Sequence, residues 1–594
     1  MTGTNNSSTS FDENTPIEEN REDESTPVKE SRDESAPMEE SRDESAPMEE
    51  NRDDESIPIE DSGEDESTVA SVLYSHLNLP DLSIPKVTDE EWTENVGECF
   101  ENTFSEKTSQ PKFPFGKTAR EIEYFKCLMS ENIINNIVTQ TNLYASQERV
   151  DPRTKKMKKT NNWVDTSTEE IEAFFGMLII MGIHSLPHVC NYWSSDPILR
   201  VESISNVMPL KRFKKLVENV HINDNSTAVP KGQDGYDKLH KLRPLIDSLN
   251  EKCSTEYEHS NMLSVDESMI PFKGRSSIKQ YMPMKPIKRG YKVWCLADSK
   301  TGFILRFSIY CGKSDSRVDG QTLGESVVLD LCKSLAGKQS LVAFDNFFTT
   351  YSLINTLLHN SIFSVGTVRA NRKGLPEMMS KKEKFDRGEF TYRVKESVAA
   401  IKWRDSKDVT VLTSAVNPRN VVFVNRTQKD GRKILVSCPE AVTLYNKTMG
   451  GVDLFDQKQE RYCLGRRSLK WWHRILYYIL DVAVVNSYTM MGQVRGNIEQ
   501  LQFRIHLARQ LINGYTSKKR RGRCPFFITK NKEFSVPLEV RTSNVGVHLP
   551  RNTGKFRRCR LCSTKKIEKR SRIECTSCNV SLCMEPCFRL FHQK

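Results

Sequence analysis

The stretches Met262–Ile270 (MLSVDESMI) and Leu341–Phe348 (LVAFDNFF) decide the fold of this chain. Each begins as a short apolar run, typical of a buried β-strand, and each then reaches an aspartate, Asp266 or Asp345. If the two strands are neighbours in one sheet, the two carboxylates lie together on a rigid edge. A single aspartate after a strand is most often a turn former or a helix cap, so neither residue identifies a site alone.

A third acidic motif, MGGVDLFDQ, carries Asp453 and Asp456 three residues apart, on one face if a helix starts there. Three converging carboxylates repel one another unless a cation neutralises them. Mg²⁺ suits oxygen ligands, and two such ions about 3.5–4 Å apart activate the attacking oxygen and stabilise the leaving one in phosphodiester chemistry. We therefore expect Mg²⁺ or Mn²⁺ at Asp266, Asp345 and Asp453.

The residues around the two strand motifs predict an α/β sheet with an antiparallel part. Further strands are expected at residues 291–298 (YKVWCLAD), 303–312 (FILRFSIYCG) and 363–368 (FSVGTV), and helices at 325–337 and 349–360. Short β-like pieces between charged turns (FTYRV, AAIKW, VTVLTS, VVFVN) predict a β-rich insertion after this sheet.

Helical patterns flank the sheet on both sides, with a helix-start signal at Thr166–Ser167 and a long helix in residues 468–492. The domains that we expect are an acidic arm at 1–115, a first helical part at 116–262, the first part of the sheet domain at 263–369, the insertion at 370–435, the third aspartate at 436–457, a second helical part at 458–535 and a Cys-rich tail at 536–594.

The start of the chain has a ten-residue acidic repeat (REDESTPVKE, SRDESAPMEE, SRDESAPMEE, NRDDESIPIE). Residues 1–70 hold 24 Asp and Glu against 5 Lys and Arg, a net charge of −19, so the other residues carry +28 of the chain's total of +9. A segment with so few apolar residues cannot offset its chain entropy by burial, and we expect it to be disordered.

The basic remainder of the chain indicates a polyanionic partner such as nucleic acid, although Lys and Arg also serve only to solubilise a surface. The first twenty residues are polar and acidic, so no signal peptide is expected. The most apolar run, Ala173–Ile183, is too short for a membrane span, which needs about 20 residues. No membrane association is expected.

The tail has the ligand pattern of a metal-binding domain. Two Cys-x2-Cys pairs and three later ligands are Cys559, Cys562, Cys575, Cys578, Cys583, Cys587 and His592. Two Zn²⁺ ions with four ligands each need an eighth, for which His548 is the candidate; it is otherwise a loop histidine. Alternating use of the pairs would give a cross-brace of the RING or PHD kind.

The flanks of the tail bear on what it binds. The segments KFRRC, STKKIEKRSR and SKKRRGR are densely basic, and phosphate contacts supply much of DNA affinity. This favours DNA over a RING-type protein-interaction role. The same basic run around Arg521–Arg523 also fits a nuclear import signal, so we expect a nuclear protein.

Basic residues crowd near the aspartate motifs and are candidates for a DNA groove, although a solvated surface explains any one of them. Of Trp471 and Trp472, one is a candidate for stacking on an unpaired base and the other for packing in the core. The DNA-contact candidates are Lys285, Lys288, Arg289, Arg369, Arg372, Lys373, Arg466, Arg467, Lys470 and Trp471.

Five ordered blocks resemble the piggyBac transposase family: SVDESMIPFKGR, IKQYMPMKPIKRGYKVWCLADSKTG, AFDNFFTT, GTVRANRKGLP and YNKTMGGVDLFDQ, followed by the Cys-rich tail. The resemblance runs from about Glu121 to the end of the chain. It implies an RNase H-like catalytic domain whose three catalytic aspartates match Asp266, Asp345 and Asp453, with a fourth important aspartate at Asp456.

The resemblance also implies an activity and partners. The family cuts double-stranded DNA at transposon terminal inverted repeats, proceeds through hairpin ends and inserts at TTAA. Its flanking helices form a joint dimerisation and DNA-binding domain, matching residues 120–262 and 458–535, so a homodimer is expected. Its Cys-rich domain binds transposon ends, and Trp471 falls where the family carries a Trp in a basic stretch.

Three functions remain open from the sequence. The first is a cut-and-paste DNA transposase, and the second is a domesticated, sequence-specific DNA-binding protein whose aspartates are unused. The third is a zinc adaptor of the ubiquitin-ligase kind. The four aspartates favour the first over the third but do not separate the first from the second.

Overall fold

The computed structural model describes residues 80–85, 91–96, 100, 107–147, 163–283, 285–312, 321–381, 384–428, 430–468, 470–518 and 545–593. The acidic repeats and the basic segment at 519–544 lie outside the described residues, so the disorder of the first stays a prediction.

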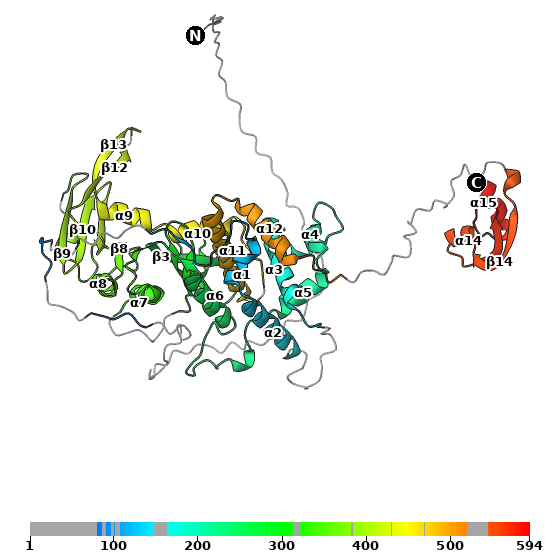
Figure 1. Cartoon of the computed structure of the whole chain (residues 1–594), viewed down its shortest axis with the longest axis horizontal. Helices are drawn as coiled ribbons and strands as arrows, with labels where there is room; N and C mark the ends of the chain where they lie inside the picture. Colours follow the sequence, from blue (N-terminus) through cyan, green and yellow to red (C-terminus); the bar gives the residue numbers. More distant parts are fainter. Residues whose placement is uncertain are drawn as a thin grey trace, which may run out of the picture. The chain divides into compact units, whose positions relative to one another are not determined.

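The core is a nine-stranded mixed sheet in the order β4-β5-β3-β7-β8-β11-β10-β9, with β6 on the far side of β5 (Figure 1). β3 pairs antiparallel with β5 and parallel with β7, which pairs parallel with β8. The parallel connections pass through the helices α7 and α8, as parallel pairs require. The order β6-β5-β3-β7-β8 confirms the predicted RNase H-like core. Its elements are β3 (Met262–Pro271), β4 (Gln280–Tyr281), β5 (Arg289–Asp298), β6 (Ile304–Ile309), α7 (Leu323–Cys332), β7 (Leu341–Phe344), α8 (Tyr351–His359) and β8 (Phe363–Thr367).

Three strands of the β-rich insertion extend this sheet, and its other two, β12 and β13, pair with each other in a separate two-stranded sheet. β11 pairs antiparallel with β8, and β10 and β9 continue outward. The insertion was expected to end at residue 435, but an unpredicted strand, β13, carries it to Pro439, because Val436 and Cys438 are buried against the neighbouring strands. The strands are β9 (Phe390–Lys395), β10 (Val398–Arg404), β11 (Asp408–Thr413), β12 (Val421–Thr427) and β13 (Lys433–Pro439).

The helices before and after the sheet pack into one helical body. α12 lies along α3, and a Cβ on Gly176 would come within 2.8 Å of the Ala508 carbonyl oxygen, so this close approach requires glycine (Figure 1). The helix start at Ser167 is confirmed, since its side chain accepts a hydrogen bond from the Glu170 N–H. The helices are α1 (Glu121–Leu128), α2 (Glu131–Gln147), α3 (Thr168–Ile183), α4 (Glu202–Ser205), α5 (Leu210–Asn219), α6 (Arg243–Thr255), α11 (His473–Arg495) and α12 (Gln500–Ile512).

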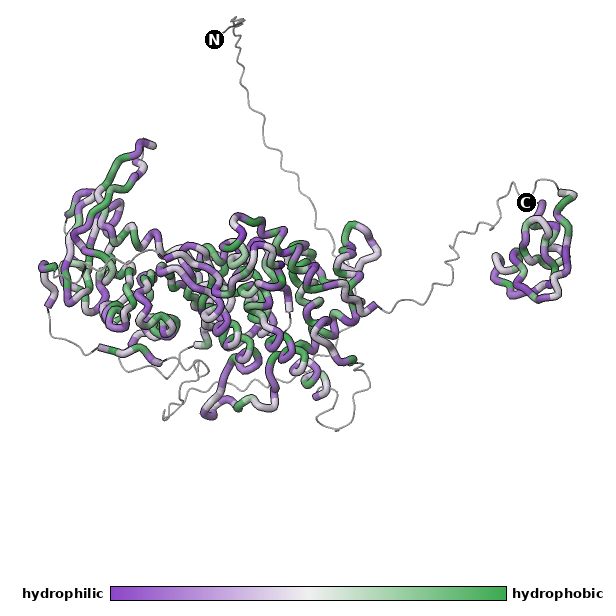
Figure 2. The backbone as a smooth tube through the Cα atoms, viewed as in Figure 1, coloured by the Kyte–Doolittle hydropathy of each residue, from purple (hydrophilic) through white to green (hydrophobic). Residues whose placement is uncertain are grey.

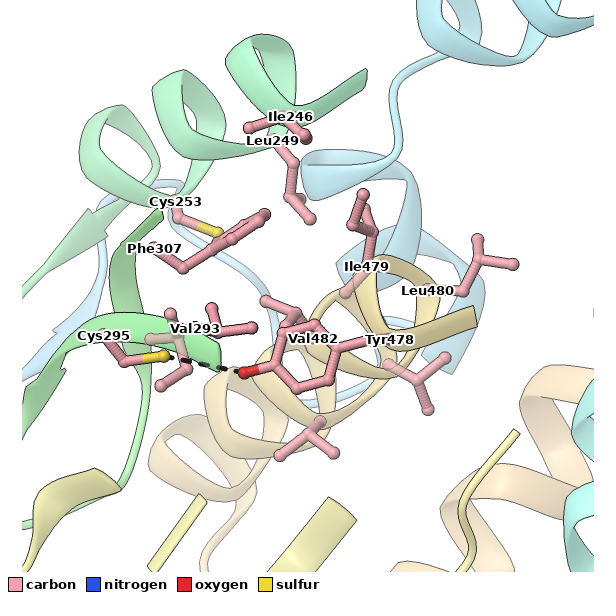
Figure 3. Packing of buried hydrophobic residues seen from close by; sticks show 14 of the residues in the cluster. Ile246, Leu249, Cys253, Val293, Cys295, Phe307, Tyr478, Ile479, Leu480 and Val482 are labelled. Atoms are coloured by element: carbon pink, nitrogen blue, oxygen red, sulfur yellow. Dashed lines mark hydrogen bonds between the residues drawn. The ribbon is translucent and has the colours of Figure 1, made fainter. Parts of the chain in front are cut away.

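The long helix α11 joins this body to the sheet. Figure 3 shows side chains of α6 and α11 meeting those of β5 and β6, with the Tyr478 hydroxyl pointing at Cys295 Sγ, 3.6 Å away. By length and composition alone α11 would cross a membrane, but 89% of its most apolar window is buried within the protein, as in a core helix. Figure 2 shows hydrophobic and hydrophilic residues interleaved throughout the surrounding elements.

The predicted boundary of the disordered arm at residue 115 is wrong. Leu82 is buried, the Trp92 indole donates to the Gly374 carbonyl at 3.1 Å, and Thr93 exchanges backbone hydrogen bonds with Val394. The short strand β1 (Gln110–Pro111) pairs with β2 (Tyr257–Glu258). These segments are ordered because their apolar side chains and backbone groups find partners on the folded body.

Candidate active site and zinc centres

The register of two parallel strands brings Asp266 and Asp345 together. Val265 on β3 is the partner of Phe344 on β7, so the next residues, Asp266 within β3 and Asp345 directly after β7, stand at equivalent positions. The Asp345 carboxylate accepts the Phe347 backbone N–H at 2.9 Å, and Asp266 accepts the Glu267 N–H at 2.8 Å. The sequence-based expectation that these strands are neighbours is confirmed.

The helix α10 (Gly451–Glu460) brings the third aspartate to the same face of the sheet. The Gly451 N–H donates to Ser264 Oγ at 3.1 Å, and a Cβ at Gly451 would lie 2.6 Å from that oxygen, which explains the glycine. One turn further along, Ser268 Oγ donates to Asp456 Oδ1 at 2.7 Å. Alternate residues of a strand share a face, so Asp266, between the two serines, also faces α10.

Burial and mutual repulsion mark these carboxylates as a charged cluster. Burial, together with the negative charges of Glu267 and Asp345, raises the pKa of Asp266 to about 7. Burial also raises the pKa of Asp345, and it raises the pKa of Asp456 to about 6, with a contribution from Asp453. Protonation is favoured at these sites because the charged forms are poorly solvated and crowded.

A tyrosine near the sheet feels the charges of the three aspartates. Burial raises the pKa of the Tyr445 hydroxyl on α9 (Glu440–Thr448), and the charges of Asp345, Asp266 and Asp453 raise it further. All three carboxylates therefore act on the same hydroxyl.

The sequence interpretation missed Glu267 and Lys292 and assigned Lys285 to DNA, whereas the structure pairs both lysines with Glu267. Glu267, next to Asp266, forms ion pairs with Lys285 at 3.2 Å and Lys292 at 3.7 Å. Burial lowers the pKa of Lys285, but the charges of Glu267, Asp266 and Asp453 outweigh that effect and raise it overall. The only signal in the sequence was the acidic residue directly after Asp266.

The donor set fits a hard divalent cation. The three aspartates offer oxygen atoms alone, which Mg²⁺ prefers, and their crowded charge is what a cation would relieve. Among the described residues, the sets of three or more possible metal ligands whose donor atoms all lie within 4.8 Å of one another are both in the tail. The carboxylate oxygens of the three aspartates are therefore spaced more widely than 4.8 Å.

A cavity of about 560 Å³ adjoins the third aspartate. Asp453, Asp456 and Glu460 line it from α10, and Lys285, Arg474 and Asp481 line it from neighbouring segments. The cavity thus borders the third aspartate, while Asp266 and Asp345 are not in its lining.

The tail contains two clusters of metal ligands with interleaved partners. Cys559, Cys562, Cys583 and Cys587 form one, and His548, Cys575, Cys578 and His592 form the other, all buried. The ligands of the two clusters alternate along the chain, because the pair Cys575 and Cys578 lies between the two Cys pairs of the other cluster. This alternation confirms the predicted cross-brace. The elements are β14 (Pro550–Arg558), α14 (Arg560–Thr564), β15 (Arg570–Cys575) and α15 (Arg589–Gln593).

The distances in the clusters suit zinc. Cys562 Sγ lies 3.5 Å from Cys587 Sγ and 4.0 Å from Cys583 Sγ. Tetrahedral Zn–S bonds of about 2.3 Å place sulfurs roughly 3.8 Å apart. His548 Nδ1 lies 3.2 Å from Cys578 Sγ, a position that fits its predicted role as the eighth ligand.

The second histidine is oriented for ligation. His592 Nδ1 lies 2.7 Å from the Phe588 carbonyl oxygen, which can only accept, so Nδ1 carries the proton and Nε2 faces Cys578 at 3.6 Å.

Comparison with known proteins now identifies the family. A family model described as "Transposase IS4" matches residues 120–488, more than half of the chain. The chain belongs to this transposase family. A second model, described as a "DDE_Tnp_1-like zinc finger", matches residues 543–593 and agrees with the two clusters.

Individual relatives of this chain carry the piggyBac name. The human "PiggyBac transposable element-derived protein 3" is 29% identical over 486 residues, covering 80% of this chain and 77% of the relative. The human "PiggyBac transposable element-derived protein 2" is 27% identical over 455 residues, covering 74% and 72%. The predicted resemblance to piggyBac transposases is confirmed.

A solved structure shares the fold. The cryo-EM structure of a piggyBac transposase synaptic complex with hairpin DNA matches with a TM-score of 0.60 at 24% identity, over 81% of this chain and 98% of that one. The RNase H-like sheet, its insertion and its helical flanks are therefore a shared architecture.

Two of the basic residues predicted to contact DNA lie at the turn after Asp345. Arg369 Nε donates to Asn346 Oδ1 at 3.1 Å, and Arg372 Nη2 donates to the Phe347 carbonyl at 3.1 Å. Lys285 lies beside the aspartates, because it forms an ion pair with Glu267, the neighbour of Asp266. The exposed members of the predicted set are Lys288, Arg289, Arg369, Lys373 and Arg467.

Two other predicted DNA contacts are engaged within the helical body. Arg466 donates to the Met181 carbonyl at 2.8 Å and lies over the Tyr192 ring. Lys470 donates to the Glu218 carbonyl at 2.5 Å. These contacts explain both residues without DNA, because α3 and α5 supply acceptors that the sequence does not reveal.

Of the two adjacent tryptophans, Trp472 is in the core, as predicted for one member of the pair. Trp472 is buried, with 2% of its surface exposed, and packs in the core. Trp471 is half-buried, and its carbonyl accepts the Tyr291 hydroxyl at 3.4 Å. Base stacking by Trp471 stays a prediction.

Proposed function

We propose that this chain is a cut-and-paste DNA transposase that cleaves and joins strands at transposon ends and uses TTAA target sites. The observation that supports it most is the in-register placement of Asp266 and Asp345 opposite the helix of Asp453. If each aspartate had only a structural role, there would be no reason for three buried or crowded carboxylates to lie on one face of the sheet.

The chain's own residues would prepare the site. Asp266, Asp345 and Asp453 would hold Mg²⁺ or Mn²⁺, which supplies activation of the attacking oxygen and stabilisation of the leaving oxygen. Ser264 and Ser268 hold α10 in place, so Asp453 is positioned on a rigid element. Lys285 balances the negative charge at the edge of the cluster.

We propose DNA binding because basic side chains are exposed near the aspartates and because the chain belongs to a transposase family. Exposed Arg369, Lys373 and Lys288 give the aspartate edge a positive surface suited to phosphates. The zinc-binding tail would bind the terminal inverted repeats. We further propose a homodimer in the nucleus, since the helical body matches the family's dimerisation region and residues 517–525 read SKKRRGRCP.

The test is strand cleavage by aspartate variants. Asp266→Asn, Asp345→Asn and Asp453→Asn should each abolish cleavage of end DNA with Mg²⁺ while leaving DNA binding intact, because an amide lacks the anionic oxygen that the cation needs. Asp386→Asn, the same change at an exposed position in the insertion, is the control. An Asn variant that cleaves at the wild-type rate would show that the assignment is wrong.

The same assay separates the alternatives. Binding of end DNA without cleavage by the wild-type chain would support a domesticated DNA-binding protein. Absence of salt-sensitive DNA binding would leave the zinc adaptor as the better account.

A further inference from the structure

Phe347, two residues after Asp345, presents an aromatic ring at the proposed active site. Its backbone N–H is bound to the Asp345 carboxylate, so its position is coupled to that aspartate. Its side chain is 37% exposed, whereas the next residue, Phe348, is fully buried. The turn therefore directs one aromatic ring into the core and leaves its neighbour partly in solvent.

The Phe347 ring is held rigidly from behind. It stacks on Trp294 with ring centroids 5.6 Å apart and planes 20° apart, and it meets Phe348 edge to face at 5.2 Å. Lys292 Nζ lies 3.7 Å from the Trp294 centroid and 5.0 Å from that of Phe347. A ring supported in this way loses little conformational entropy when a flat ligand covers its exposed part.

Basic groups surround the same turn. Arg372 donates to the carbonyls of Asn346 and Phe347, and exposed Arg369 is anchored on the Asn346 side chain. Exposed Lys373 follows in the same loop. An aromatic platform beside a row of cations is the combination that binds single-stranded nucleic acid, by stacking bases and attracting phosphates.

We infer that Phe347 is a stacking platform for an unpaired nucleobase next to the phosphodiester held at Asp266 and Asp345. The inference rests on the proposed function. A base within a duplex is stacked on its neighbours and offers only its edges in the grooves, so the ligand must be unpaired. Stacking tolerates every base, so this contact recognises strand state and not sequence.

The experiment uses the full chain and two DNA probes, a blunt duplex and the same duplex with a 5′-TTAA single-stranded overhang. The overhang carries 2-aminopurine in place of an adenine, because its fluorescence is quenched on stacking. Binding is measured in Ca²⁺, so that cleavage does not interfere. Phe423→Ala, the same change at an exposed ring on the insertion, is the matched control.

Phe347→Ala should lower affinity for the overhang DNA by roughly fivefold to a hundredfold, the range for loss of one base–aromatic stack, and leave affinity for the blunt duplex unchanged. It should also abolish the quenching, while Phe347→Trp and Phe423→Ala retain it. Unchanged quenching in Phe347→Ala, or equal loss of affinity for both probes, would overturn the inference. If the wild-type chain bound neither probe, the proposed function itself would fail.

Discussion

Ser268 on β3 donates a hydrogen bond to Asp456 on α10 across 2.7 Å. The two residues are 188 positions apart in the chain, and the bond fixes α10 against the strand that carries Asp266. Asp456 therefore has a partner that explains its burial without a metal ion. Its assignment as a fourth catalytic aspartate stays a prediction, and the hydrogen bond supplies the means to test it.

We expect Ser268→Ala to reduce cleavage and Asp456→Asn to preserve most of it. Asn retains an oxygen that accepts from Ser268, whereas Ala removes the donor and releases the helix that positions Asp453. Loss of a hydrogen bond to a charged group costs about 1.5–3 kcal/mol, and a displacement of about 1 Å at a reacting centre costs on the order of a hundredfold in rate. Single-turnover cleavage and thermal unfolding measure the two effects. An inactive Asp456→Asn chain that binds DNA would instead show that Asp456 is a metal ligand.

Damage to one of the two zinc clusters should remove one zinc ion and leave the other bound. His548→Ala should lower bound zinc from two ions to about one per chain, because three remaining ligands hold zinc weakly. Cys559→Ser should affect the other cluster in the same way. Metal analysis of purified protein measures both, with exposed His188→Ala as the control. Full zinc occupancy in His548→Ala would exclude this histidine as a ligand.

Asp481 on α11 predicts a pH-dependent contribution to stability. It is fully buried, and it accepts the Gln459 side-chain N–H at 2.9 Å and the Leu464 backbone N–H at 3.0 Å. Burial raises its pKa from 3.8 to about 6, despite the opposing charge of Arg504, whose Nη2 lies 3.8 Å away. The folded state therefore binds an extra proton between these two values.

Stability from this group is fully present below pH 3.8 and falls as pH rises through about 6, by up to about 3 kcal/mol. Asp481→Asn cannot titrate, so it lacks this slope, although it also leaves Arg504 without its partner at every pH. Melting temperatures of both proteins from pH 4 to 7 test the difference. Parallel curves would show that the carboxylate stays ionised throughout.

Two truncations of the N-terminal region should have different effects on the melting temperature. Removal of residues 1–70 should leave the melting temperature unchanged, because the acidic repeats hold few large apolar residues. It should also raise DNA affinity at low salt by removing negative charge that competes with phosphate. Removal of 1–115 should lower the melting temperature, since it strips Leu82 and Trp92 from the folded body. Equal effects of the two truncations would contradict this boundary.

The sequence by itself determined many of the local elements and the ligand pattern of the zinc-binding tail. The apolar strand segments before Asp266 and Asp345, the helix start at Ser167 and the spacing of the tail cysteines depend on residues close together in the chain. Such patterns follow from the periods of strands and helices and from the ligand needs of zinc, so they can be read without a fold.

The tertiary structure alone decided how these pieces meet. The pairing of Val265 with Phe344, the joining of the insertion to β8 through β11, and the ion pairs of Glu267 with Lys285 and Lys292 link distant parts of the chain. It also turned Arg466 and Lys470 inward, although their sequence context resembles that of exposed cations. Each of these contacts depends on which surfaces pack against one another, and that is a property of the whole fold that no local pattern contains.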